Sequence, residues 1–217
     1  MQRDTSRSFL CIGTSMKLYY MTGACPLATH IVLEWIGAPY EIAEVKHDQL
    51  KSPAYLKINP GGLVPALVDG DAVLTENVAI LHYLAELHPQ ARLDGDGTPL
   101  GRAEVNRWLG FVNSEVHQSF KPIFGPERFL ADKTQHADLA AHAKDKLRGL
   151  FALVETRLAK HDWLGGARRS IADPYLYVVL RWAKAKAIDL SGFKHLESFF
   201  QRMDADAGVK AALRAEA

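Results

Sequence analysis

The sequence predicts two parts of different class, an α/β domain followed by an all-helical domain. Apolar runs with strand and helix spacing alternate from 16 to 87. A stretch rich in Pro, Gly and Asp then covers 88–101, and every later apolar pattern has helical spacing. The 217 residues are enough for one large core or two small ones. We place the two domains at 16–95 and 100–217.

The N-terminal part alternates between strands and helices around clear turn signals. Pro26 suits the first position of a helix, and Gly37 suits its end. Asp69-Gly70 predicts a hairpin between two short apolar runs. This order favours a small mixed sheet of about four strands covered by helices. The predicted strands are 17–21, 40–45, 65–68 and 71–74, and the predicted helices are 26–36, a short one from Ser52-Pro53, and 75–87.

The C-terminal part shows helical spacing only. Long amphipathic helices are predicted at 99–122 and 134–160, with a turn at Trp163–Gly166. Ser170-Ile171-Ala172-Asp173 precedes an apolar run and has the form of a capping box, with Asp in place of the usual Glu. Two shorter helices are expected to finish the chain.

Composition and charge exclude several classes of function. A net charge of +1 gives no electrostatic case for nucleic acid or an anionic membrane, and no apolar run is long enough to span a bilayer. Cys11 and Cys25 are the only cysteines, so we expect no disulfide framework and a cytoplasmic location. The nine histidines lack metal-site spacing, so we expect no metal. Residues 1–15 are predicted to be a disordered extension.

Cys25 is the first candidate for chemistry. It follows the turn Thr22-Gly23-Ala24 and precedes Pro26, at the predicted start of a helix. Free N–H groups and the helix dipole favour a thiolate there, so we expect a lowered pKa for Cys25. A free cysteine is more often a small buried apolar residue. Its position at a helix start favours the functional interpretation.

A second candidate is the loop before the third predicted strand. Asn59-Pro60 and Gly61-Gly62 mark a turn, and Pro65 lies at the mouth of the strand that follows. Proline does not fit a central strand pairing without special geometry. A cis Val64–Pro65 bond is one good solution, although cis bonds are uncommon before proline.

Five blocks of the sequence, in order, resemble the glutathione transferases, and most closely their bacterial, cysteine-containing beta class. The match runs from about residue 16 to the end of the sequence. The blocks are Lys17-Leu18-Tyr19-Tyr20 with Gly23-Ala24-Cys25 and His30-Ile31; Asn59-Pro60-x-Gly62-x-Val64-Pro65-Ala66-Leu67; Leu74-Thr75-Glu76-x-Val78-Ala79-Ile80; Trp108-Leu109 with Ser114-Glu115-Val116-His117; and Ser170-Ile171-Ala172-Asp173.

The resemblance implies a thioredoxin-like domain followed by an all-helical domain, in a homodimer that conjugates glutathione to small electrophiles. It implies that the cis-proline loop Val64-Pro65 pairs with the cysteinyl part of glutathione through the backbone. It also implies that Glu76 and Asn77 hold the γ-glutamyl end. The implied catalytic residues are Cys25 and His117, and the implied glutathione-binding residues are Tyr20, Ala24, Leu63, Val64, Pro65, Glu76, Asn77 and Asn113.

Three positions depart from that class. Pro26 stands where many relatives have Ser, Gln118 where several have Lys, and Gly110 where an Asn is expected. We hypothesise that Asn113, one turn on, compensates for Gly110. The electrophile itself cannot be named from the sequence. Its pocket is expected among side chains of the helical domain such as Val112, Phe120, Phe124, Trp163 and Tyr175.

Two other functions stay open at this point. One is a glutathione-dependent thiol-disulfide oxidoreductase or dehalogenase that uses Cys25 as its nucleophile. Ala28 stands where a second redox cysteine would be, so only a one-cysteine exchange is possible. The other is a non-enzymatic interaction module built on the transferase fold.

Overall fold

A computed structural model describes residues 16–217, so Cys11 and the predicted extension at 1–15 lie outside the described residues. The N-terminal part forms a four-stranded mixed sheet in the order β2-β1-β3-β4. β1 runs parallel to β2, whereas the pairs β1–β3 and β3–β4 are antiparallel. The strands are β1 (Met16–Tyr20), β2 (Tyr40–Glu44), β3 (Ala66–Asp69) and β4 (Ala72–Thr75).

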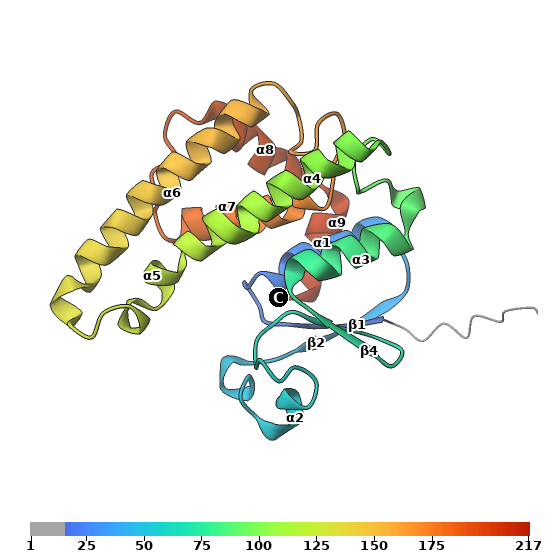
Figure 1. The fold of residues 1–217 in the computed structure, drawn as a ribbon, viewed down its shortest axis with the longest axis horizontal. Coiled ribbons are helices and arrows are strands. Elements are labelled where there is room, and N and C mark those ends of the chain that lie inside the picture. The colour runs from blue at the N-terminus through green and yellow to red at the C-terminus, as the bar shows by residue number, and fades with distance from the viewer. Residues whose placement is uncertain (1–15) are drawn as a thin grey trace, which may run out of the picture.

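Helices cover both faces of this sheet, which confirms the predicted α/β architecture. Figure 1 shows α1 (Pro26–Ile36) and α3 (Asn77–Leu87) between the sheet and the helical domain, with α2 (Pro53–Leu56) on the opposite side. α1 begins at its predicted proline and ends at Gly37, whose φ of 72° is left-handed. The cis Val64–Pro65 bond is confirmed.

The second part contains helices only, as predicted, but the predicted helix at 99–122 is interrupted. α4 (Pro99–Phe111) passes into a π-helical turn, Val112–His117, and a separate short α5 (Lys121–Phe124) follows. The remaining helices are α6 (His136–Leu158), α7 (Ala172–Ala185), α8 (Lys194–Ala205) and α9 (Ala207–Ala215). Short 3₁₀ turns lie at His47–Gln49, Pro89–Ala91, Pro126–Arg128 and Lys133–Gln135.

The start of α7 corrects the predicted capping box. The backbone N–H of Ser170 donates to Oδ2 of Asp173 at 2.7 Å, as a capping box requires. The Ser170 hydroxyl, however, also donates to Oδ2 at 2.8 Å, where the motif would have it accept a backbone N–H. Asp173 is fully buried, and burial raises the pKa of its carboxyl to about 6. Only half of the motif is therefore formed.

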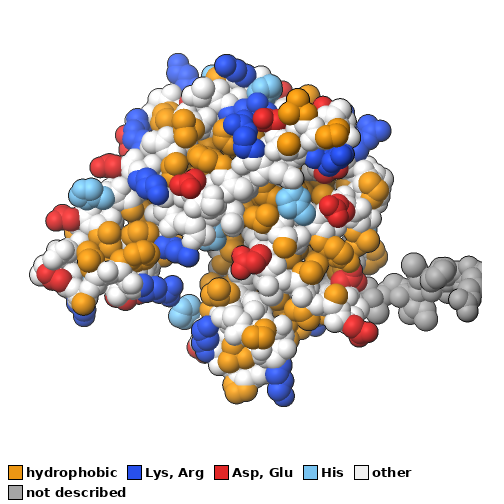
Figure 2. Space-filling model, viewed as in Figure 1, with side chains coloured by type: hydrophobic (Ala, Val, Ile, Leu, Met, Phe, Trp, Pro, Cys, Tyr) orange, Lys and Arg blue, Asp and Glu red, His pale blue; other side chains and the backbone are white. Residues whose placement is uncertain are grey.

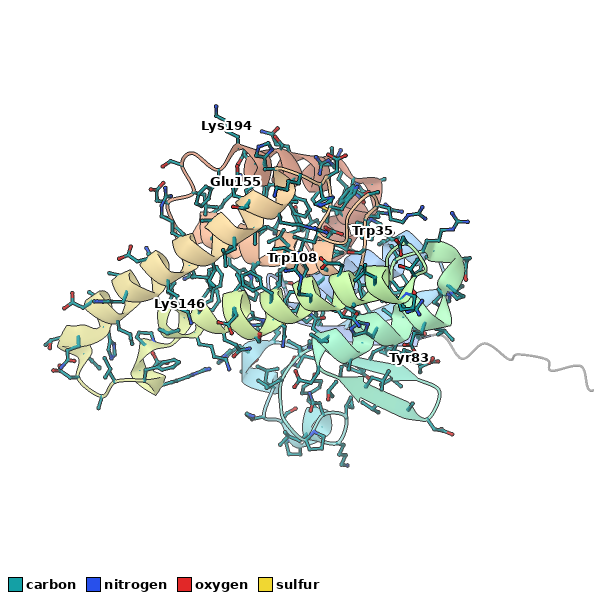
Figure 3. The ribbon with its side chains drawn as sticks, turned by 45° about the horizontal axis from the view of Figure 1, so that its top comes forward. Trp35, Tyr83, Trp108, Lys146, Glu155 and Lys194 are labelled. Atoms are coloured by element: carbon teal, nitrogen blue, oxygen red, sulfur yellow. The ribbon has the colours of Figure 1, made fainter. Side chains whose placement is uncertain are left out.

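The two parts share one core, because α1 packs against both α7 and α9. Trp35 at the end of α1 donates its indole N–H to Asp206, at the start of α9, at 2.8 Å (Figure 3). Residues 172–180 of α7 are all buried, which makes this helix the centre of the molecule. Within residues 16–217, no helix is long and apolar enough to cross a membrane.

Candidate active site

A cavity of about 510 Å³ lies between the two domains and gathers most of the predicted site residues. Figure 2 shows a hollow between the lobe that carries α5 and the lobe that carries α2. The α/β domain lines the cavity with Cys25, Asn59, Gly61, Leu63, Val64, Pro65, Thr75, Glu76 and Asn77. The helical domain lines it with Asn113, His117, Gln118, Lys121 and Tyr175.

Cys25 lies at the start of α1, as predicted, but the expected lowering of its pKa is wrong. Burial, together with the nearby Glu76 carboxylate, raises the pKa of the Cys25 thiol to about 12. The thiol donates to the Val64 carbonyl at 3.8 Å between Sγ and O. Loss of water around sulfur therefore outweighs the helix dipole, and Cys25 is a protonated thiol at neutral pH.

The side chain of Asn77 joins the starts of α1 and α3. Its Nδ2 donates to the Cys25 carbonyl at 2.9 Å, and its Oδ1 accepts from the Thr29 hydroxyl at 2.7 Å. Asn77 and Thr29 are both buried. The side-chain amide of Asn77 thus holds the start of α1 in place. The backbone N–H of Asn77, at the start of α3, is the group of this residue that can bind a ligand.

The loop before β3 presents backbone groups to the cavity. The Leu63 carbonyl accepts from the Tyr55 hydroxyl and from Nδ2 of Asn59, each at 2.7 Å, which fixes the loop. Gly62 has a φ of 60°, and a side chain there would collide with the Leu50 carbonyl. In residues 16–217, no hydrogen bond uses the N–H of Val64. This N–H is free to pair with an extended ligand.

Glu76 occupies an unusual backbone position at the edge of the cavity. Its φ of 67° is left-handed, a conformation that costs a residue with a side chain on the order of 1–3 kcal/mol. The residue is exposed, and no hydrogen bond or ion pair engages its carboxylate within the described part of the chain. It immediately precedes α3, whose first N–H groups are unpaired. A carboxylate and free N–H groups therefore lie side by side.

On the opposite wall, Tyr175 joins His117 to Asn113. The buried Tyr175 hydroxyl donates to Oδ1 of Asn113 at 2.9 Å and lies 2.6 Å from Nδ1 of His117. Because the phenol has one proton, Nδ1–H of His117 donates to it, and Nε2 is an acceptor. Burial, followed by the charge of Lys121, lowers the pKa of His117 to about 4. His117 is therefore neutral at pH 7.

Two of the predicted binding residues do not line this cavity. Tyr20 is buried, with its ring 6.2 Å from that of His30, and Ala24 closes a backbone turn onto Met21. Of the side chains expected around the electrophile, only Tyr175 lines the cavity. Phe120 and Phe124 pack against Trp182, which contacts the ring of His117. Val112 is buried in the core, and Trp163 packs on Phe199.

Asn59, Gly61, Thr75 and Lys121 also line the cavity but were not predicted as site residues. Asn59 and Gly61 lie in the predicted loop, and Thr75 precedes Glu76, so the local sequence pointed near them. Lys121 lies four residues after His117, and this spacing was the signal that could have placed it on the same side of the helix. No group of three or more His, Cys, Asp or Glu in residues 16–217 is arranged to hold a metal ion.

Comparisons with known proteins agree with this arrangement. Residues 14–86 match the model of the glutathione S-transferase N-terminal domain, and 111–206 match that of the C-terminal domain. The chain is 48% identical to glutathione S-transferase GST-4.5 of Xanthomonas campestris, over 93% of this chain and 98% of the relative. It also resembles the solved glutathione S-transferase of Xylella fastidiosa, with a TM-score of 0.90 and 48% identity over 93% and 98% of the two chains.

A third relative is the structure of a sphingomonad glutathione S-transferase in complex with glutathione, with a TM-score of 0.82 and 35% identity over 92% of this chain and 98% of that one. The fold and the cavity define a two-domain protein of the transferase type, with a thioredoxin-like first domain. The chain belongs to the glutathione S-transferase family.

Proposed function

We propose that this protein conjugates the thiol of glutathione to small hydrophobic electrophiles, and that it belongs to the beta class. One observation carries the proposal. The cavity places a free Val64 N–H beside Cys25, with the Glu76 carboxylate and the start of α3 at its other edge. These groups match the extended backbone, the ammonium group and the carboxylate of a γ-glutamyl tripeptide. The volume also lies in the range of ordinary ligand pockets.

Each part of glutathione then has a partner of suitable chemistry. The cysteinyl part pairs with the backbone of Val64, next to the cis Pro65, and adds a short strand to the loop. Glu76 receives the ammonium group, and the unpaired N–H groups of α3 receive the γ-glutamyl carboxylate. Asn113 and Lys121 face the ligand from the helical domain.

Activation of the thiol follows from the state of Cys25 and His117. Nε2 of the neutral His117 accepts a hydrogen bond from the S–H of bound glutathione and orients it, and the proton leaves to water. Because an ordinary thiol has a pKa of about 8.5, His117 is too weak a base to keep this proton. The thiolate is stabilised by the dipole of α1, by the Lys121 ammonium group and by the S–H of Cys25, which turns from the Val64 carbonyl to the bound sulfur. Lowering its pKa toward about 6–7 requires about 2–3 kcal/mol, which these groups can supply.

The conjugation step then needs only a positioned electrophile. The glutathione sulfur attacks an electrophilic carbon, a C–S bond forms, and the leaving group departs with the electrons of its bond. An aromatic cluster next to His117 offers a surface for such an acceptor. Trp182 contacts the ring of His117 at 4.8 Å between centroids, and the exposed Phe124 contacts Trp182 at 5.3 Å. A hydrophobic, flat acceptor fits this surface.

The alternative in which Cys25 is itself the nucleophile is less well supported. A thiol with a pKa of about 12 has almost no thiolate at pH 7, and a nucleophilic cysteine needs thiolate. The position of Cys25 still allows a slow exchange with glutathione disulfide, which forms a mixed disulfide at Cys25 and releases one glutathione thiol.

Two assays test these functions. Isothermal titration with reduced glutathione should show binding, and an activated aromatic halide should be conjugated. Cys25→Ala should bind glutathione and conjugate the halide about tenfold more slowly, because one hydrogen bond to the thiolate is lost. If Cys25→Ala instead loses activity toward a glutathione mixed disulfide and conjugates the halide at the wild-type rate, the result would favour the oxidoreductase. If the titration shows no heat of binding with glutathione, both enzyme functions fail and the non-enzymatic interaction module is the remaining interpretation.

The proposal also includes a homodimer in the cytoplasm. Large apolar side chains that are about half exposed or more, such as Leu100 on α4 and Leu153 on α6, support contact with a second copy. Sedimentation of the purified protein at micromolar concentration should give twice the mass of the chain. A monomer at that concentration would contradict this part.

A further inference from the structure

The turn that carries Cys25 is held from the helical domain as well as from its own. The Thr22 hydroxyl donates to the backbone carbonyl of Glu216 at 3.0 Å. The Trp182 indole N–H donates to the Gly23 carbonyl at 2.8 Å. Trp182 lies on α7 and Glu216 directly follows α9, so both contacts cross between the domains. The position of the turn therefore depends on where these helices lie.

Glu216 makes a second contact that reaches the other side of Cys25. Its Oε1 lies 2.8 Å from Nδ1 of His30, which is on α1 five residues after Cys25. Nε2 of His30 lies 2.9 Å from the Tyr40 hydroxyl of β2. His30 is 0% exposed and Glu216 is 6% exposed, and charged side chains are rarely buried unless they are paired. Figure 1 shows the C-terminal end of the chain beside α1 and β1.

We propose that Glu216 is a positioning residue for the glutathione site. It holds the segment around Cys25 at two points, with its backbone carbonyl through Thr22 before the cysteine and with its carboxylate through His30 after it. With both points fixed, Sγ of the half-buried Cys25 stays against the Val64 carbonyl, and the start of α1 stays directed at the cavity. When either point is lost, the turn moves away from Val64 and the thiol becomes more exposed to water.

Two consequences follow, and only one of them rests on the proposed function. The reactivity of Cys25 depends on its exposure to water whether or not glutathione binds. The KM for glutathione depends on the alignment of α1 and Val64, so it rests on the proposed function. A loosened turn weakens glutathione binding more than it slows the chemical step, because the groups around His117 lie on other elements.

The experiment compares two variants with the wild type: Glu216→Ala, which removes the contact with His30, and Thr22→Val, which removes the contact with the Glu216 backbone carbonyl. Alkylation of Cys25 by iodoacetamide should be about tenfold faster in both, which corresponds to a pKa about one lower. The KM for glutathione should rise about threefold to tenfold, and kcat should fall less, by about threefold, because Cys25 and the start of α1 also stabilise the thiolate. Thr22 is exposed, so Thr22→Val keeps the fold even where Glu216→Ala does not.

Tyr177→Phe is the matched control. Its buried hydroxyl donates to Asp204 and joins α7 to α8, away from the turn. This variant should lower the Tm and leave both the alkylation rate and the KM unchanged. Wild-type alkylation rates in Glu216→Ala and Thr22→Val would overturn the proposal and make Glu216 a stabilising residue only. If glutathione fails to bind the wild type, the proposed function fails, and the alkylation rates still decide this inference.

Discussion

The two walls of the cavity are built in different ways. The wall from the α/β domain consists of backbone groups and residues at element ends, around Cys25, Val64 and the start of α3. The wall from the helical domain consists of side chains that reach inward from helix surfaces, with Tyr175 joining His117 and Asn113. The wall from the α/β domain suits a ligand with a constant peptide backbone. The wall from the helical domain suits the chemical step and acceptors of different shapes. Substitutions should therefore affect binding at one wall and turnover at the other.

The largest effect is expected for Asn77→Ala, which removes the side-chain hydrogen bonds that join the start of α3 to α1. The variant leaves the buried Thr29 hydroxyl without its partner and removes one of the hydrogen bonds to the Cys25 carbonyl, which costs about 2–3 kcal/mol of unfolding free energy. Chemical denaturation measures it, with the exposed Asn106→Ala as control. An equal, small effect of both variants would show that this wall is not held by Asn77.

This wall is also the part that the sequence predicted best. Pro26, Asp69-Gly70 and Asn59-Pro60 mark element ends locally, so β1 to α3 followed from residue type and spacing, whereas the cis Val64–Pro65 bond followed from the resemblance to the family. The pKa of Cys25 did not, because burial depends on the packing of Val64 and Glu76 from other elements. The π-helical turn at Val112–His117 was missed because its apolar spacing still suited an α-helix.

The next effect is expected for Glu76→Gln, which removes the charge that would hold the ammonium group of glutathione. The Kd for glutathione should rise about 30-fold, since a hydrogen bond to a charged group is worth about 2 kcal/mol. Titration calorimetry measures it, and Glu86→Gln on the same helix is the control, because its side chain is exposed. Unchanged affinity in Glu76→Gln would contradict the placement of the γ-glutamyl end.

Tyr175→Phe tests the helical wall. Without the hydroxyl, Nδ1 of His117 loses its partner and the imidazole its fixed orientation, so kcat should fall about tenfold. The Kd for glutathione should stay within about twofold. Steady-state kinetics and calorimetry separate the two, with Tyr177→Phe as control. A large loss of affinity with normal kcat would mean that Tyr175 serves binding instead.

The smallest effect is expected for Lys121→Gln. Lys121 disfavours the positive charge of His117, so its removal should raise the pKa of His117 from about 4. The titration of the His117 ring protons by NMR, in the absence of ligand, gives this pKa directly. The shift should be upward and modest, because burial is the larger cause. A pKa that falls in Lys121→Gln would contradict the assigned electrostatics.

The protonation state of Cys25 decides between two roles. A protonated thiol can donate a hydrogen bond to the thiolate of bound glutathione, whereas a thiolate can itself attack the substrate. The ultraviolet absorbance of thiolates, followed from neutral to alkaline pH in the ligand-free protein, measures it with Cys25→Ala as reference. With a pKa of about 12, Cys25 should add no thiolate signal over Cys25→Ala below about pH 10. A thiolate that titrates at or below about pH 8 in the wild type, and is absent from Cys25→Ala, would contradict this account.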